Sequence, residues 1–509
     1  MSRTINTVRN IRYAIIGQTF GLVISFLARM VFVRTLGAEY LGLNGLFSNI
    51  LSMLSLADLG IGSAIIYSLY KPLAEKNEPK IQALMALFKR AYISIGIIIF
   101  VLGFSITPFL PYLVDKMPDI PHINLIYMMF VADAAISYFF SYKRSLIIAD
   151  QKRYIATLYR YGFYFVLNSA QIIILLTTGN FILFLLLQIL NTSLENIFIS
   201  RRANKIYPFL TKRDHEKLHA EEKKSISRNV KAMIGHKIGG VVVLGTDNII
   251  LSKFVGLVTV GLYSNYLLIT GALNTILGLI FEAATASIGN LGVTETKERS
   301  HFIFRCVDIF GFWIYSFSSI CLFILLNPFI KIWLGEQYLF SISLVSVIVV
   351  NFYLEGMRKS VLSFRDAYGL YWYDRYKPFF SAGINLIVSI LLVIYIGTIG
   401  VFIGTAVSIL TTCFWVEPYI LHKYVFKISS VKYFQIYVLR TVLFLCTGIL
   451  TWFLCSLIGE EGIINFLGKV LVCIIIPNLI YLILFWHKDE FKHLLLIVRK
   501  WTSIADNQP

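Results

Sequence analysis

Long apolar runs separated by short polar segments recur along the whole chain. Most runs are about 20 residues long, which is the length that an α-helix needs to cross the hydrocarbon core of a bilayer. The pattern predicts an all-α polytopic membrane protein with about fourteen transmembrane helices. We expect these helices at 13–33, 43–69, 86–110, 123–147, 155–177, 180–200, 232–254, 257–282, 302–327, 339–362, 378–396, 399–421, 434–458 and 463–486.

Composition and charge agree with this interpretation. Hydrophobic residues make up 57% of the chain and the mean hydropathy is +0.73, whereas soluble domains are about 45–50% apolar. The net charge of +18 does not indicate nucleic-acid binding, because the lysines and arginines lie in short loops between the runs. The opposite loops are short and nearly neutral, for example TTGN at 177–180, IGTIG at 396–400 and IGEEG at 458–462. The positive-inside rule therefore predicts a multi-pass protein of the plasma (inner) membrane with both termini in the cytoplasm.

Two segments of the chain resemble each other and indicate an internal repeat. The first is LGAEYLGLNGLFSNIL, which starts at residue 36, and the second is VGLVTVGLYSNYLLI, which starts at residue 255. A shift of 219 residues places Gly37 on Gly256 and Gly42 on Gly261. Repeats of this kind predict two structurally related halves.

The repeat suggests how the chain is divided. A second match, at a shift of 217 residues, places Asn168 on Asn385. Each repeat holds six of the expected helices, and an even number brings both lobes into the membrane from the same side as parallel repeats. We expect an N-terminal lobe (helices 1–6) at 1–200, a basic cytoplasmic linker at 201–231, a C-terminal lobe (helices 7–12) at 232–425, two appended helices at 426–487 and a cytoplasmic amphipathic tail at 488–509.

The N-terminal region carries a resemblance to a known family. The stretch RNIRYAIIGQTFGLVISFLARMVFVRTLGAEYLGLNGLFSNILSMLSLADLGIGSAIIYSLYKPLAE and the segment YKRSLIIADQKRYI at 142–155 are similar to the polysaccharide-type flippases of the multidrug/oligosaccharidyl-lipid/polysaccharide (MOP) exporter superfamily. These are the Wzx-like proteins of bacterial capsule and O-antigen clusters. The resemblance implies two six-helix lobes in a V-shaped, MATE-like bundle around a central cavity.

The same resemblance implies a function. Members move oligosaccharide repeat units linked to undecaprenyl diphosphate from the inner to the outer leaflet, by alternating access. The partners implied are the lipid-linked oligosaccharide, membrane lipids, and the polysaccharide polymerase and glycosyltransferases of the same pathway. The alternatives are a drug/cation antiporter of the same superfamily, which would favour an acidic site, and a membrane polysaccharide polymerase, which would need a large outward loop.

Enzyme and cofactor signatures are absent from the sequence. It contains neither GxxxxGK[ST] nor HExxH, its eight histidines show no ligand spacing, and its six cysteines form no CxxC pair. We therefore expect no enzymatic activity, no cofactor and no metal site.

Three bases are candidates for binding the diphosphate: Arg29, Arg34 and Lys237. Fixed cations facing a water-filled cavity would neutralise the phosphates, and a guanidinium matches phosphate oxygens well. For Arg29 the resemblance favours this role, because an arginine in the first helix matches the cationic cavity of lipid-diphosphate flippases. The competing interpretation for all three is a side chain that snorkels to the membrane surface, and for Arg34 that interpretation is the stronger one.

Three acids within the runs are candidates for ion or proton coupling, or for a gate: Asp58, Asp133 and Asp247. A lone carboxylate deep in a membrane is costly unless it is protonated or paired across helices, so a structural polar contact is the alternative. Glu355 has Arg358 at i+3 and is expected to form an intrahelical ion pair.

Membrane-embedded amides are candidates for sugar contacts. Amides hydrogen-bond well to sugar hydroxyls, but they also hold transmembrane helices together, and both roles stay open. The candidates are Gln18, Asn49, Asn168, Asn248, Asn265 and Asn274.

Overall fold

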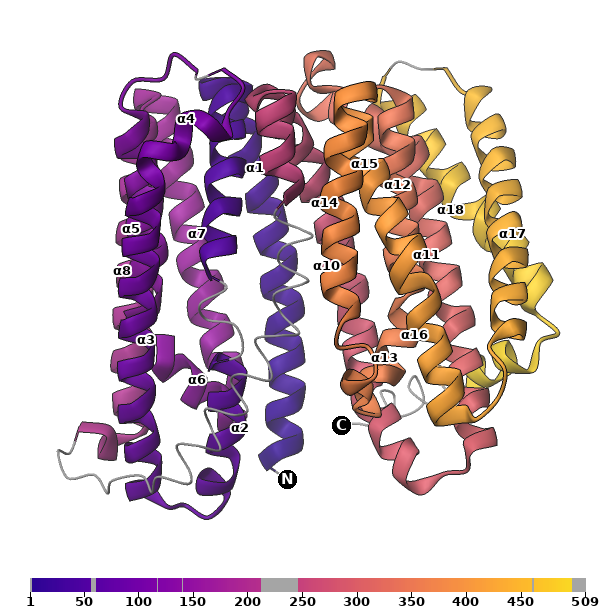
Figure 1. Ribbon diagram of the computed structural model, residues 1–509, viewed down its shortest axis with the longest axis horizontal. Coiled ribbons are helices and arrows are strands. Elements are labelled where there is room, and N and C mark those ends of the chain that lie inside the picture. The colour runs from indigo at the N-terminus through magenta and orange to yellow at the C-terminus, as the bar shows by residue number, and fades with distance from the viewer. Residues whose placement is uncertain are drawn as a thin grey trace. The chain divides into compact units, whose positions relative to one another are not determined.

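The computed structural model describes residues 2–55, 61–116, 118–139, 141–211, 246–459 and 462–496 (Figure 1). Helices form every regular element of these residues, and no strand occurs among them. Within the described residues, ten helices are long and apolar enough to cross a membrane, and an eleventh span results if the bent pair α5 (Ile123–Phe139) and α6 (Ser141–Ala149) is counted as one. The expected fold class, an all-α multi-pass membrane protein, is confirmed.

The lower helix count is consistent with the fourteen expected spans. The first span and the start of the second merge into α1 (Ser2–Leu54), which is broken inside by Gly37. The expected tenth span is divided between α12 (Ile342–Met357) and α13 (Lys359–Ala367), each too short to be counted. Most of the expected seventh span falls in 212–245, outside the described residues.

The chain forms two compact units, Met1–Gly261 and Leu262–Pro509. In the first unit α1 packs along α7, α3 along α5, and α8 against both α5 and α7. Its apolar core gathers side chains of α2, α3, α6, α7 and α8, with Leu69, Leu146 and Ile199 fully buried. The further elements of this unit are α2 (Ile61–Ala74), α3 (Glu78–Ile106), η2 (Thr107–Phe109), α4 (Leu110–Leu113), α7 (Arg153–Thr178), α8 (Phe181–Ile206) and η3 (Pro208–Thr211).

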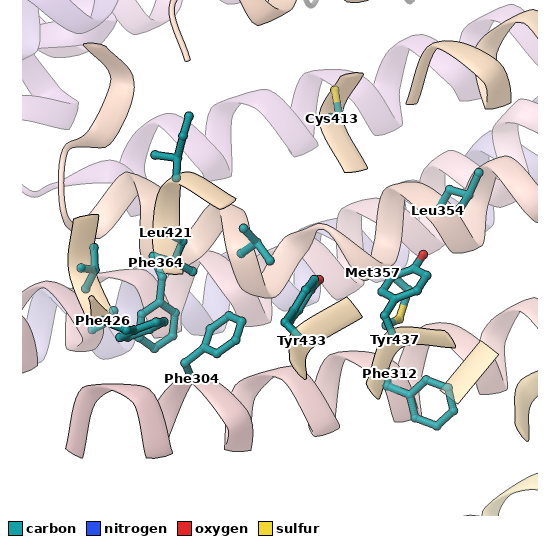
Figure 2. Close-up of a cluster of buried hydrophobic side chains, with 14 of the residues drawn as sticks. Phe304, Phe312, Leu354, Met357, Phe364, Cys413, Leu421, Phe426, Tyr433 and Tyr437 are labelled. Atoms are coloured by element: carbon teal, nitrogen blue, oxygen red, sulfur yellow. The ribbon is translucent and has the colours of Figure 1, made fainter. Parts of the chain in front are cut away.

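The second unit has an aromatic core. Phe304 packs edge-on against Phe364 at 5.3 Å between ring centroids, and Phe426 and Tyr433 lie beside them (Figure 2). Short π-helical turns precede and follow α16, which contains Pro418. The elements are α10 (Leu257–Thr294), which starts in the first unit, α11 (Lys297–Trp333), η4 (Glu336–Tyr338), α12, α13, η5 (Leu370–Trp372), α14 (Lys377–Ile396), α15 (Thr398–Ser408), η6 (Ile409–Cys413), α16 (Phe414–Leu421), η7 (His422–Phe426), α17 (Val431–Ser456) and α18 (Ile463–Phe485).

The repeat seen in the sequence has a counterpart in the backbone. Gly37 and Gly256 both have positive φ angles, of 85° and 117°, which residues with a Cβ adopt only with strain. Equivalent breaks therefore occur at equivalent points of the two repeats.

Gly42 and Gly261 form a reciprocal close contact. A Cβ on Gly42 would lie 2.0 Å from the carbonyl oxygen of Leu257, and a Cβ on Gly261 would lie 2.3 Å from that of Ala38. The shift of 219 residues relates Ala38 to Leu257 and Gly42 to Gly261, so each partner in the contact is the repeat equivalent of the other. Small residues allow such close backbone approach between membrane helices.

We predict that Gly42→Ala destabilises the protein by about 1–3 kcal/mol, as overpacking usually does. The reason is that the obstructing atom is a backbone oxygen, which moves only if a helix moves. Thermal unfolding of the purified protein in detergent measures the effect. Gly278→Ala on α10 is the matched control, because no atom lies within 4 Å of a Cβ built there. Equal melting temperatures for the two variants would contradict the close contact.

Candidate functional site

A polar seam runs between α1 and α7 in the first unit. Gly17 and Gly21 leave room for Tyr161, whose ring carbon would lie 2.1 Å from a Cβ on Gly17. The hydroxyl of Tyr161 donates a hydrogen bond of 2.5 Å to the side-chain oxygen of Gln18. Close packing at the glycines thus brings two polar side chains together within an otherwise apolar helix pair.

Arg29 and Asn168 extend this seam. Arg29 is partly buried on α1, on the same helix pair as Tyr164 of α7. Asn168 is 7% exposed, and its amide donates to the backbone oxygen of Tyr164 at 2.7 Å. We define the α1–α7 seam as Gln18, Arg29, Tyr161, Tyr164 and Asn168.

The seam joins three residues that sequence reasoning had selected separately, namely Gln18, Arg29 and Asn168. Sequence reasoning missed Tyr161 and Tyr164. The signal for them was the spacing G-x-x-x-G at 17–21, which marks a face of a membrane helix that another helix approaches closely. A guanidinium, two tyrosines and two amides can together bind phosphate oxygens and sugar hydroxyls.

The other candidate cations are Arg34 and Lys237. Arg34 is exposed and lies three residues before the break at Gly37, a position that suits a surface anchor as well as a binding residue. Lys237 lies outside the described residues, as does the candidate acid Asp58.

Asp133 of α5 is paired across helices with an amide. Gln188 of α8 donates to its Oδ2 at 2.7 Å. Its Oδ1 is buried and has no hydrogen-bond partner among the described residues. The carboxyl group therefore has one buried oxygen that accepts no hydrogen bond from the described residues.

The remaining candidates lie in mainly structural surroundings. Asp247 and Asn248 are buried in a helical segment at 246–254. This segment is tied to the C-terminal end of α4 by a 2.9 Å hydrogen bond from Ser252 to the backbone oxygen of Leu113. Asn49 donates to the backbone oxygen four residues earlier at 2.9 Å. Asn265 and Asn274 lie on α10, where Asn265 is fully buried and Asn274 half-buried.

The second unit holds a buried ion cluster that sequence reasoning did not predict. Arg358 donates two hydrogen bonds to Glu417, of 2.9 and 2.7 Å, and Lys377 also donates to Glu417. Lys377 and Arg365 both contact Asp374, at 2.9 and 2.8 Å. Arg358 thus pairs with Glu417 instead of the expected Glu355. A carboxylate within an apolar run, as in FWVEPYIL, was the available signal.

The fold is MATE/MurJ-like, by comparison with solved structures. No protein-family model matches the sequence, and no curated protein matches it. The likeness comes from solved structures at sequence identities that show the fold alone.

The inward-facing conformation of a multidrug resistance MATE family transporter of the MOP superfamily aligns with a TM-score of 0.63 and 16% identity, over 78% of this chain and 94% of that chain. The lipid II flippase MurJ, in an inward closed conformation, aligns with a TM-score of 0.63 and 13% identity, over 93% of this chain and 99% of that chain. A MATE protein in a bent conformation aligns with a TM-score of 0.54 and 16% identity, over 82% and 95%.

Proposed function

We propose that this protein is a flippase for lipid-linked oligosaccharides. It would move repeat units carried on undecaprenyl diphosphate from the inner to the outer leaflet of the bacterial plasma membrane, for capsule or O-antigen-type polysaccharide. The observation that carries the proposal is the α1–α7 seam, in which Arg29 lies on the same helix pair as the hydroxyl of Tyr161 and the amides of Gln18 and Asn168. The likeness to a lipid II flippase over 93% of the chain supports it.

In this proposal Arg29 binds the diphosphate while the seam's tyrosines and amides contact the sugar. Arg34 and Lys237 add positive charge, and Asp247 contributes to a gate. With the cell interior negative, outward movement of the anionic head is favoured by about 2.3 kcal/mol per charge per 100 mV. No nucleotide hydrolysis is then required.

The organisation that goes with the proposal keeps the boundaries expected from the sequence. The lobes at 1–200 and 232–425 would expose the substrate site alternately to the two sides of the membrane. Both termini and the linker at 201–231 would lie in the cytoplasm. The polymerase and glycosyltransferases of the pathway are the proposed partners.

The proposal is tested by reconstitution into proteoliposomes. A labelled undecaprenyl-diphosphate oligosaccharide should become accessible to a membrane-impermeant reagent faster than in protein-free vesicles. A cationic dye should not be exported. Dye export without lipid movement would favour the antiporter instead.

The drug/cation antiporter is the second candidate, and Asp133 is the observation that favours it. A buried carboxyl oxygen without a partner among the described residues is a plausible place for a proton in either transporter, since an intramembrane acid usually has a functional role.

We predict that Asp133→Asn abolishes the acceleration of transport by an acid-outside pH gradient and preserves the rate at equal pH. Asparagine can still accept the hydrogen bond from Gln188 but cannot take up a proton. Asp119→Asn, in an exposed loop, is the control and should behave like the parent. The coupling role would be contradicted if the pH gradient still accelerated transport by Asp133→Asn. It would also be contradicted if the gradient did not accelerate transport by the parental protein.

A further inference from the structure

A cavity of about 230 Å³ lies in the first unit, away from the α1–α7 seam. Its walls come from α3, α6 and η3. Liquid water occupies about 30 Å³ per molecule, so the cavity has room for several waters or for a phosphate group. The lining residues are Gln82, Met85, Ala86, Lys89, Tyr142, Lys143 and Leu210.

Two lysines, Lys89 and Lys143, line this cavity. Lys89 and Lys143 interact with each other electrostatically as like charges. Neither forms an ion pair within the part of the chain that the structure describes. The side chain of Lys143 donates instead to the neutral Asn204, at 2.9 Å.

The acids on the neighbouring elements are already engaged elsewhere. Glu195 of α8 pairs with Arg144 at 2.5 Å. Asp150 forms an ion pair with Lys152 at 2.7 Å and accepts a hydrogen bond of 2.7 Å from the hydroxyl of Tyr207. Burial, together with the Asp150 carboxylate, raises the pKa of Tyr207, so this phenol remains a donor. No acid of this group is left to serve the two lysines.

Two side chains in the wall of the cavity are buried and held by contacts within the fold. Gln82 is 8% exposed, and its amide donates to the backbone oxygen of Phe209, which ties η3 to α3. Tyr142 is 7% exposed, and Lys143 lies 5.9 Å from the centre of its ring. Lys143 is partly buried and held by Asn204, whereas Lys89 is exposed at the mouth of the same cavity. Two cations at one cavity match the oxygens of a phosphate.

We infer that this Lys89–Lys143 cavity is a second anion site, which binds a phosphate group. The group can come from a membrane lipid headgroup or from a soluble phosphate compound, since both present the same oxygens. The inference does not depend on the proposed transport function, because it uses different helices and needs no substrate movement.

The test measures binding to the purified full-length protein in a neutral detergent by calorimetry. Two probes are used, inorganic pyrophosphate and dioctanoyl phosphatidic acid, and the one that binds identifies the source of the group. The double variant Lys89→Gln/Lys143→Gln should bind the probe at least about tenfold more weakly, which corresponds to about 1.4 kcal/mol. Lys143→Arg should retain binding. The matched control is Lys205→Gln, an exposed base at the end of α8 that does not line the cavity.

Melting temperature adds a readout that a merely structural role would not produce. Without anion, Lys89→Gln should melt at the parental temperature or above it, because it removes a like-charge repulsion. With pyrophosphate or the lipid, only the parent and Lys205→Gln should gain stability. Binding of neither probe to the parent would overturn the inference, as would equal weakening in the control.

Discussion

Replacing Glu417 with alanine is expected to lower the free energy of unfolding by about 3–5 kcal/mol, the usual cost of breaking a buried ion pair from one side. The side chain of Glu417 is fully buried, and it is gripped by Arg358 and Lys377. Removing it leaves Arg358 without the carboxylate it pairs with and leaves Lys377, whose side chain is only 6% exposed, with Asp374 alone. Unfolding in detergent, followed by tryptophan fluorescence, measures the effect.

The control for this prediction is a pair of the same kind on the surface. The Lys331 ammonium lies 2.5 Å from a carboxylate oxygen of Glu336, but the two side chains are 40% and 70% exposed. Water and salt screen such a pair, so Glu336→Ala should have a much smaller effect. A cycle that combines Glu417→Ala with Arg358→Ala should show strong coupling. Equal effects at Glu417 and Glu336, or additive effects in the cycle, would mean that the buried cluster does not stabilise the second unit.

Replacing Arg29 with glutamine is expected to slow transport of the diphosphate-linked oligosaccharide about 10–100-fold. A hydrogen bond to a charged group contributes about 1.5–3 kcal/mol, and each 1.4 kcal/mol is a factor of ten. Arg29→Lys should keep part of the rate, since it keeps the charge but not the guanidinium fork. The measurement is the transport rate of the labelled lipid in proteoliposomes.

The matched control is Arg202→Gln, which removes an exposed base near the end of α8. It should transport at the parental rate, and both variants should keep the parental melting temperature. If Arg29→Gln also transports at the parental rate, Arg29 is an anchor at the membrane surface and the seam is structural.

The helices were predictable because span length and apolarity are local properties. The expected span at 378–396 corresponds to α14, Lys377–Ile396, and that at 463–486 to α18, Ile463–Phe485. The expected span at 339–362 is interrupted after Met357. At that point Arg358 forms the C-cap of α12 and pairs with Glu417, 59 residues away. A partner so distant does not appear in a local pattern.

The side-chain pairings at the candidate site could not be predicted from the sequence. Depth in the membrane indicated that Asp133 needs a partner, yet the partner is Gln188, 55 residues away, and it is an amide. Gln18 meets Tyr161 across 143 residues. These contacts are set by which helix faces pack together, and glycine spacing gives only a partial indication of those faces.

The most direct measurement is the rate at which the parental protein exposes labelled undecaprenyl-diphosphate oligosaccharide on the outer face of proteoliposomes, with and without an inside-negative potential. The account predicts a rate well above that of protein-free vesicles, which rises when the potential is applied, because the moving head is anionic. A rate equal to that of protein-free vesicles at every potential, with cationic compounds transported instead, would contradict it.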